Sequence, residues 1–208
     1  MERLIENNQV IICGRITEEF AYNHEVFGER FYESTMEVMR TSGKPDFVPI
    51  MVSERLVPVH EQWAEKFCKI TGNFRSYNKH IDERTCLILS VYARTFDVLE
   101  EREDKNEIFL DGHLCKQPVY RETPMGREIA DMLVAVNRPY GKSDYIPCVA
   151  WGRNAKYVSG FDVATQVNLR GRIQSREYIK KFADGTEEKR TAYEVSCGRL
   201  EIVEETEE

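Results

Sequence analysis

The clearest pattern in the chain is an alternation of apolar and polar positions in its second half. Side chains two positions apart share one face of an extended strand, so this alternation predicts strands with one buried face. It recurs in five stretches, and Asp184-Gly185 favours a tight hairpin turn between the last two. The positions expected to face the core are Ile108, Leu110, Gly112 and Leu114; Ala130, Met132, Val134 and Val136; Ile146, Cys148 and Ala150; Val167, Leu169, Gly171 and Ile173; and Tyr193, Val195 and Cys197.

Between the third and fourth strands the first half shows a different spacing. Apolar residues recur every three or four positions, which predicts an amphipathic helix, and a proline stands in its first turn. The second half has only a short equivalent, around residues 154–160. Five strands with a helix between the third and fourth is the order of an OB-fold barrel. The residues that define the longer helix are Leu56, Pro58, Val59, Trp63, Phe67 and Ile70; Trp63 is expected to cap the barrel core.

The two halves repeat each other at an offset of 98 positions. Residues 8–16 align with residues 106–114, Arg40 aligns with Arg138, and residues 43–49 align with residues 141–147; farther along, Ser76 aligns with Ser175 at an offset of 99. A register held over this length indicates an internal duplication. We therefore predict an all-β chain of two tandem, five-stranded OB-fold barrels, each with a helix between strands 3 and 4. The predicted domains are residues 1–101 and residues 102–208.

The charge distribution differs between the halves. The net charge of −7 does not favour nucleic-acid binding, which usually depends on a basic surface. From Lys105 to Arg199, however, 16 Lys and Arg face 12 Asp and Glu, a local balance of +4. The basic character is therefore concentrated in the second half.

Several classes of protein are not expected. No apolar run approaches the roughly 18 residues of a membrane span, and residues 1–6 lack the apolar core of a signal peptide. The six cysteines include no C-x-x-C pair, and the His113-x-Cys115 pair is interpreted as incidental on an alternating strand. We expect reduced thiols in the cytoplasm, no disulfide framework and no metal site.

An enzyme is not expected either. The sequence has no phosphate-cradling glycine loop, no G-x-S-x-G elbow, and no His, Cys and Asp cluster at metal-ligand spacing. The acidic residues Asp111, Asp131 and Asp144 fall on separate segments and are expected to be solvated. We therefore predict no catalytic residue and no cofactor.

Strand parity also defines the surface that points away from the second core. Taken singly, an aromatic or an arginine on the outer face of a strand is ordinary. Together they interleave flat rings with guanidinium groups, which is the combination that a single strand of nucleic acid requires for its bases and phosphates. The outward residues are Tyr145 and Trp151 on the third strand and Arg170, Arg172, Arg176 and Tyr178 on the fourth.

An ordered set of motifs covers nearly all of residues 105–204. It comprises Asn106, Leu110-x-Gly112-x-Leu114, Pro118, Gly126, Ala135-Val136-Asn137-Arg138, Trp151-Gly152, Arg170-Gly171-Arg172-Ile173-Gln174-Ser175-Arg176-x-Tyr178 and Glu194-Val195. With this set the second half resembles the bacterial single-stranded DNA-binding proteins. The resemblance implies sequence-tolerant binding and protection of single-stranded DNA during replication, recombination and repair. It also favours DNA over RNA, a choice that the residues alone leave open.

The resemblance also implies a set of binding residues. Four aromatic positions would stack on bases, three arginines would guide the backbone, and two further cations would contribute more weakly. These are Tyr140, Tyr145, Trp151 and Tyr178; Arg138, Arg172 and Arg176; and Lys142 and Arg153.

The first half departs from this pattern. Ser42, Ser53 and Lys79 stand where the second half has Tyr140, Trp151 and Tyr178, whereas Phe47 retains an aromatic ring. The first half is therefore expected to serve assembly or to add a weak DNA contact. The residues that could make this contact are Phe47, Arg75, Tyr77 and Lys79.

Assembly and partners are implied by the same resemblance. Family members with one barrel generally form tetramers and those with two form dimers, so we expect a homodimer that presents four barrels. Residues 204–208 are acidic but lack the Pro-Phe ending of the family, so recruitment of repair and replication proteins is not expected. Two alternatives stay open: an accessory primosomal OB protein that acts through protein partners, and an interaction module without nucleic-acid binding. Strongly salt-dependent binding would exclude the module.

Overall fold

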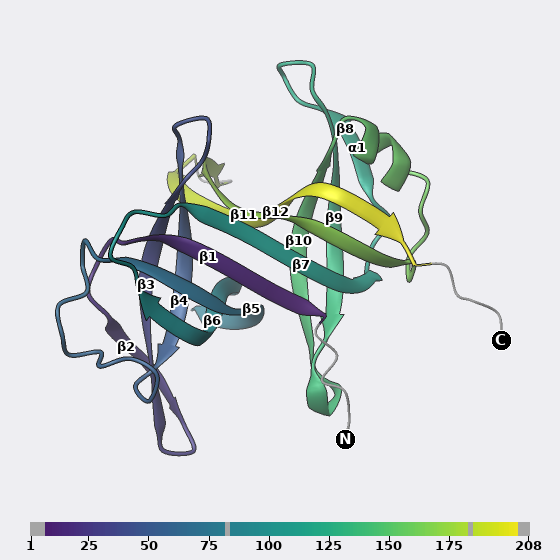
Figure 1. Cartoon of the computed structure of the whole chain (residues 1–208). Coiled ribbons are helices and arrows are strands. Elements are labelled where there is room, and N and C mark those ends of the chain that lie inside the picture. Colours follow the sequence, from purple (N-terminus) through teal and green to yellow (C-terminus); the bar gives the residue numbers. More distant parts are fainter. Residues whose placement is uncertain (1–6, 82–83, 183–184, 204–208) are drawn as a thin grey trace.

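The computed structural model describes residues 7–81, 84–182 and 185–203 of the chain (Figure 1). Within these residues, twelve strands, one α-helix and one 3₁₀ turn are joined by turns and loops. The first repeat contains β1 (Asn8–Ile16), β2 (Ala21–Val26), β3 (Glu29–Met39), β4 (Pro45–Ser53), β5 (Phe67–Ile81) and β6 (Arg84–Val98). The second repeat contains β7 (Lys105–Leu114), β8 (Val119–Glu122), β9 (Glu128–Asn137), the 3₁₀ turn η1 (Pro139–Gly141), β10 (Ser143–Trp151), α1 (Arg153–Val158), β11 (Gln166–Lys181) and β12 (Glu187–Ile202).

Five strands of each repeat close into a ring. In the first repeat β1 pairs with β3 and β5, β3 pairs with β4, β5 pairs with β6, and the parallel pair β4–β6 completes the barrel. In the second repeat β7, β9, β10, β12 and β11 follow the same order. The remaining strands, β2 and β8, extend β3 and β9. This closed order is that of the OB fold, so the predicted all-β class with two tandem OB folds is confirmed.

The alternating positions of the second repeat form its core. Leu110, Ile146 and Ile173 are fully buried, as the period of two predicts. Gly112 on β7 lies against β9, where a Cβ atom would collide with the carbonyl oxygen of Ala135. Glycine at this position therefore lets two barrel strands cross closely.

The long helix predicted in the first repeat is wrong. No helix forms among the described residues between β4 and β5; Val59 and Trp63 are buried in a looped segment, and Ile70 lies on β5. The carboxylate of Glu19 accepts the backbone N–H groups of Trp63 and Ala64 at 2.8 and 3.1 Å, which holds this backbone in a non-helical path. Trp63 nevertheless caps the core as predicted. In the second repeat α1 confirms the short helix.

Strands β1 and β7 join the barrels side by side (Figure 1). They pair antiparallel, and Val10 lies directly opposite Ile108, its own counterpart at the offset of 98. Asn8 lies opposite Leu110 and Ile12 opposite Asn106, which are the same pairing with the repeats exchanged. An approximate two-fold axis therefore passes between Val10 and Ile108, and the barrels share one continuous sheet of twelve strands.

Two asparagines extend the hydrogen bonding of these central strands. The side chain of Asn8 accepts the N–H of Phe74 at 2.8 Å and donates to its carbonyl oxygen at 2.7 Å. Asn106 makes the same two bonds with Ile173, at 2.8 and 2.7 Å. Each amide thus continues a strand ladder across the bulge in β5 or β11.

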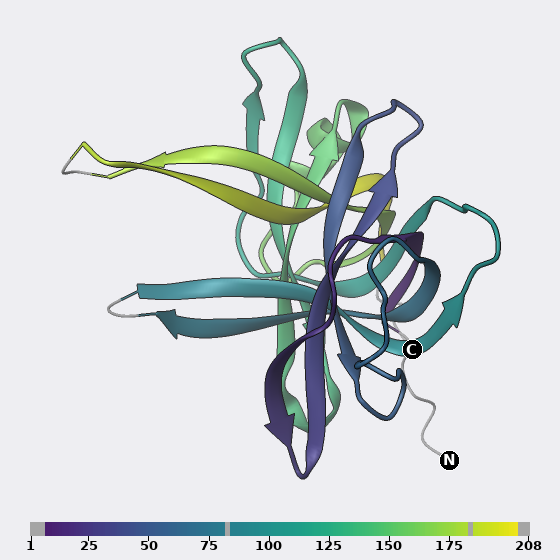
Figure 2. The ribbon, with the colours of Figure 1, turned by 90° about the vertical axis from the view of Figure 1, so that its left-hand side faces the viewer.

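The hairpins β5–β6 and β11–β12 extend beyond the barrels and project toward the same side of the molecule (Figure 2). In the predicted turn at the tip of β11–β12, Asp184 lies outside the described residues, whereas Gly185 has a φ of +83°, as a tight turn requires. In the part of the chain that the structure describes, no helix is long and apolar enough to cross a membrane.

Candidate nucleic-acid interface

Three of the four aromatic residues predicted to stack on bases are open to solvent. Tyr145 on β10 is 47% exposed and Tyr178 on β11 is 36% exposed. Tyr140 in η1 is fully exposed, and its φ of +64° turns the side chain out of the barrel. These rings can accept a base by stacking without prior rearrangement of the core.

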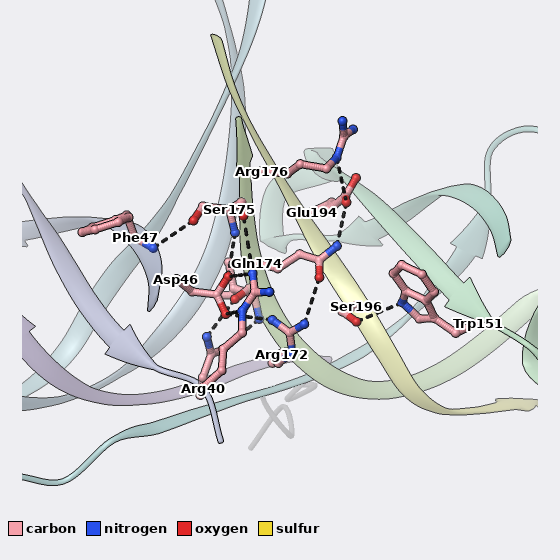
Figure 3. A network of polar contacts seen from close by, with 12 residues as sticks. Arg40, Asp46, Phe47, Trp151, Arg172, Gln174, Ser175, Arg176, Glu194 and Ser196 are labelled. Carbon is pink, nitrogen blue, oxygen red and sulfur yellow. Dashed lines mark hydrogen bonds and ion pairs between the residues drawn. The ribbon is translucent and has the colours of Figure 1, made fainter. Parts of the chain in front are cut away.

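Trp151, the fourth aromatic position, is half-buried at the end of β10. Its indole N–H donates to the hydroxyl of Ser196 on β12 at 3.1 Å (Figure 3). This bond fixes the edge of the ring against β12. The ring therefore has a defined orientation before any base arrives.

The cations predicted to act beside these rings differ in how tightly they are held. The guanidinium of Arg176 lies 5.8 Å from the ring centre of Tyr178, and its ion pair with Glu194 spans 3.7 Å. Its side chain is 55% exposed, so Arg176 can reach a phosphate. Lys142 and Arg153 are also exposed.

Arg138 lies in a different setting. Its guanidinium pairs with the carboxylate of Asp144 and donates to the carbonyl oxygen of Ser76 in the first repeat at 2.8 Å. Arg75 of the first repeat donates to the same carboxylate at 3.0 Å, and the N–H of Ser76 donates to it at 2.6 Å. Asp144 is fully buried, so the expectation that it is solvated is wrong. This cluster connects β10 with β5 and holds the two repeats together.

Arg172 belongs to the counterpart of that cluster (Figure 3). The buried carboxylate of Asp46 accepts Arg40 at 2.7 Å, Arg172 at 2.7 Å and the N–H of Ser175 at 3.0 Å. Burial lowers the pKa of Arg172, although the neighbouring Asp46 opposes this effect. Arg172, like Arg138, is therefore engaged with a carboxylate between the repeats.

A chain of polar contacts leads from this cluster to the outer face (Figure 3). Arg172 donates to the side-chain oxygen of Gln174 at 3.0 Å, and the Gln174 amide donates to Glu194 at 2.7 Å. Glu194 is the partner of Arg176. The contact between the repeats and the candidate phosphate-binding arginine thus share one network.

The first-repeat residues predicted to make weak contacts occupy two places. Phe47 on β4 is 41% exposed, and its backbone N–H donates to the hydroxyl of Ser175 at 2.9 Å. Arg75, Tyr77 and Lys79 lie on β5 and line a cleft between the repeats with a volume of about 770 Å³. Phe47 is thus separate from the group on β5.

This cleft also contains residues that the sequence did not indicate. Asn23 and His24 of the first repeat line one part, and Tyr92 on β6 lies at its wall. Arg138 and Tyr140 enter from the second repeat. The cleft is therefore built by both barrels.

Strand register identifies the residue of the second repeat that corresponds to Tyr92. In the parallel pairs, Met51 lies opposite Tyr92 in the first repeat and Val149 lies opposite Ser196 in the second. Tyr92 is thus the counterpart of Ser196, at an offset of 104. The offset between corresponding residues is 99 before the hairpins β5–β6 and β11–β12 and 104 after them. A sequence alignment that keeps the offset of 99 therefore does not match Tyr92 with Ser196.

A second hollow, of about 400 Å³, has a different lining. Glu18, Glu19 and Glu33 lie along it, together with Thr191 and Tyr193 from β12. Neither lysine nor arginine contributes to it among the described residues. Within the same described ranges, no group of three or more His, Cys, Asp and Glu side chains is arranged to hold a metal ion.

One family model matches the second repeat. Residues 105–203 match the family model described as "Single-strand binding protein family". Single-stranded DNA-binding protein 3 of Listeria innocua serovar 6a is 36% identical over 80 residues, covering 35% of this chain and 50% of that protein. Single-stranded DNA-binding protein A of Bacillus subtilis is also 36% identical over 80 residues, covering 35% and 46%. The chain spans about half the length of the curated relatives it matches.

A solved structure matches both repeats. The wild-type single-stranded DNA binding protein from Thermus aquaticus superposes with a TM-score of 0.77 over 97% of this chain and 95% of that chain. The two sequences are 19% identical over the match, so the likeness concerns the fold. Two barrels arranged as in this chain therefore also occur in that protein.

Proposed function

We propose that this chain binds single-stranded DNA without strong sequence preference, because residues 105–203 match the model of the Single-strand binding protein family. The observation that carries the proposal is the exposure of rings and a cation on the second repeat: Tyr145 on β10 is exposed, and on β11 the exposed guanidinium of Arg176 lies 5.8 Å from the ring centre of Tyr178. Rings stack on any base and cations attract phosphates, so such a face tolerates any sequence. The function is binding rather than catalysis, and it would protect single strands during replication, recombination and repair.

We assign the residues of this face to two roles. Tyr140, Tyr145, Trp151 and Tyr178 stack on bases, while Arg176, Lys142 and Arg153 contact phosphates. Arg138 and Arg172 act mainly by fixing the two repeats relative to each other, because their guanidinium groups are held by buried carboxylates. They support the face without needing to touch DNA.

The two domains have different roles in this proposal. Residues 102–208 carry the main DNA-binding face, and residues 1–101 serve assembly and a weaker contact. The proposed assembly is a homodimer that presents four barrels. We also propose a cytoplasmic location, which the six free cysteines support.

The proposal is tested by titrating a fluorescent oligothymidine of about 35 nucleotides with the purified chain at 50 and 200 mM salt, with a duplex of equal length as control. If three cations contact phosphates, the salt slope is about −2 and the affinity falls about 20-fold over this range. Weak binding to the duplex is expected, since its bases are hidden. Absence of single-strand binding at 50 mM would overturn the proposal and favour the interaction module. Binding that requires a protein partner would favour the primosomal alternative.

A further inference from the structure

The cleft between the repeats brings rings from both barrels together. Tyr77 on β5 and Tyr92 on β6 come from the first repeat, and Tyr140 of η1 comes from the second. The ring of Tyr140 is fully exposed, so its faces are available to a ligand. At about 770 Å³ the cleft falls within the range of sites that hold molecules the size of a nucleotide.

An aromatic row continues from the cleft across the first repeat. The rings of His24 and Phe31 are stacked, with centres 5.0 Å apart and planes 7° apart. Phe31 lies 6.3 Å from Tyr92 at a tilt of 47°. Ser53, which replaces the tryptophan of the second repeat, is paired with Phe31 on the neighbouring strand. The first repeat thus has rings beside the position where its β4 lacks one.

The charge of the cleft suits a polyanion. Lys79, Arg75 and Arg138 line it, and neither Asp nor Glu does so among the described residues. The carboxylate of Asp144, paired with both arginines, offsets one of these three charges, which leaves a balance of about +2. The other hollow between the repeats is lined by three glutamates and would repel DNA. Of the two hollows, only this one combines rings with positive charge.

We propose that this cleft is a second nucleobase-binding site, in which single-stranded DNA crosses from the second repeat to the first. A base stacks on Tyr77 or Tyr140, and Lys79 contacts the adjoining phosphate. The site rests on the proposed function and specifies the surface through which the first repeat contacts DNA. Tyr92 on β6 supplies a ring in the first repeat, where β4 has Ser53 at the position of Trp151.

The test compares three variants with the wild-type chain in titrations with oligothymidine of about 35 nucleotides. Tyr77→Ala removes a ring and is expected to weaken binding at least about fivefold, while Tyr77→Phe retains the ring and is expected to bind like the wild type. Lys79→Glu changes an exposed residue and is expected to make the salt slope shallower by about 0.7. A thermal melt of each variant confirms that it folds.

Crosslinking locates the strand directly. Oligonucleotides with 4-thiothymidine at each position in turn are irradiated with the protein, and the modified peptides are identified by mass spectrometry. Crosslinks within residues 72–81 or 90–98 are expected. In the titrations, the matched control for Tyr77→Ala is Tyr157→Ala, which removes an exposed tyrosine on α1 outside the cleft.

The two proposals fail differently. If the wild-type chain binds no single strand, the proposed function itself is wrong. If the wild type binds but Tyr77→Ala and Lys79→Glu bind equally well and all crosslinks fall in the second repeat, the function stands and the cleft is not a binding site.

Discussion

The backbone N–H of Ser76 in the first repeat donates to the buried carboxylate of Asp144 in the second, at 2.6 Å. The reverse contact, from Ser175 to Asp46, measures 3.0 Å. Each barrel therefore provides an anion that the other barrel satisfies with one N–H group and one guanidinium, that of Arg75 or Arg172. Besides the β1–β7 strand pairing, the contact between the repeats therefore includes two ion-pair clusters whose carboxylates are buried.

Removing one of these carboxylates should weaken the contact between the repeats and destabilise the protein. Asp144→Ala leaves Arg75 and Arg138 facing each other without a counter-charge, and we expect the free energy of unfolding to fall by about 3 kcal/mol. Chemical denaturation followed by circular dichroism measures this loss. The matched control is Asp131→Ala, whose ion pair with Arg121 is exposed and should contribute less than about 1 kcal/mol. Equal losses in the two variants would contradict the structural role of Asp144.

The stacking face of the second repeat can be tested by removing two rings together. Tyr145→Ala combined with Trp151→Ala should weaken binding of oligothymidine by at least about 30-fold, because each lost stack contributes on the order of 1–3 kcal/mol. Fluorescence titration at fixed salt gives the ratio of dissociation constants. Tyr120→Ala removes an exposed ring from β8 and should leave binding unchanged. Unchanged affinity in the double variant would refute the assignment of these two rings.

Two buried thiols predict how stability changes with pH. Burial raises the pKa of Cys13, aided by the nearby Glu103, and burial raises that of Cys68; both reach about 11. Between about pH 9 and 11 the unfolded chain loses these protons while the folded chain retains them, so the free energy of unfolding falls as pH rises. Urea denaturation at pH 8 and 10.5 measures the change. A Cys13→Ala, Cys68→Ala variant should show a smaller fall over this range, and an identical fall would argue against the thiols as its source.

The proposed assembly predicts a molar mass in solution. A homodimer of the 24.3 kDa chain has twice that mass, and it should persist at micromolar concentration. Light scattering coupled to size exclusion, with and without oligothymidine, measures the mass directly. A mass of one chain under both conditions would defeat the four-barrel assembly.

The sequence predicts the strands well because period-two alternation and the barrel core have the same physical cause. Ile108 and Leu110 must point inward together, and the offset of 98 extends this reading to Val10 and Ile12. Helical spacing was misleading around Trp63, since apolar residues that cap a barrel from a loop can fall at intervals of three or four. Only the tertiary contact with Glu19 determines which backbone path they follow.

The site was predictable in part. Exposed rings such as Tyr145 follow from strand parity alone. The roles of Arg138 and Arg172 do not, because a guanidinium that points outward from one barrel can point into the neighbouring one. The alignment of the two repeats shows the pairs Arg40–Asp46 and Arg138–Asp144 at the same positions. In the structure each pair belongs to a cluster around a buried carboxylate.

Tyr92 and Ser196 stand at corresponding positions of otherwise matching strands, and this difference affects the direction in which a nucleic-acid strand can bind. A nucleic-acid strand has two chemically different ends, and two identical barrels related by a two-fold axis would offer it the same surfaces whichever way it ran. In this chain a strand that crosses the axis meets Trp151 held by Ser196 on one side, whereas Ser53 and Tyr92 occupy the two corresponding positions on the other. The sequence differences between the two repeats make the two sides distinguishable, so a single molecule can favour one 5′-to-3′ polarity of the strand across its two barrels.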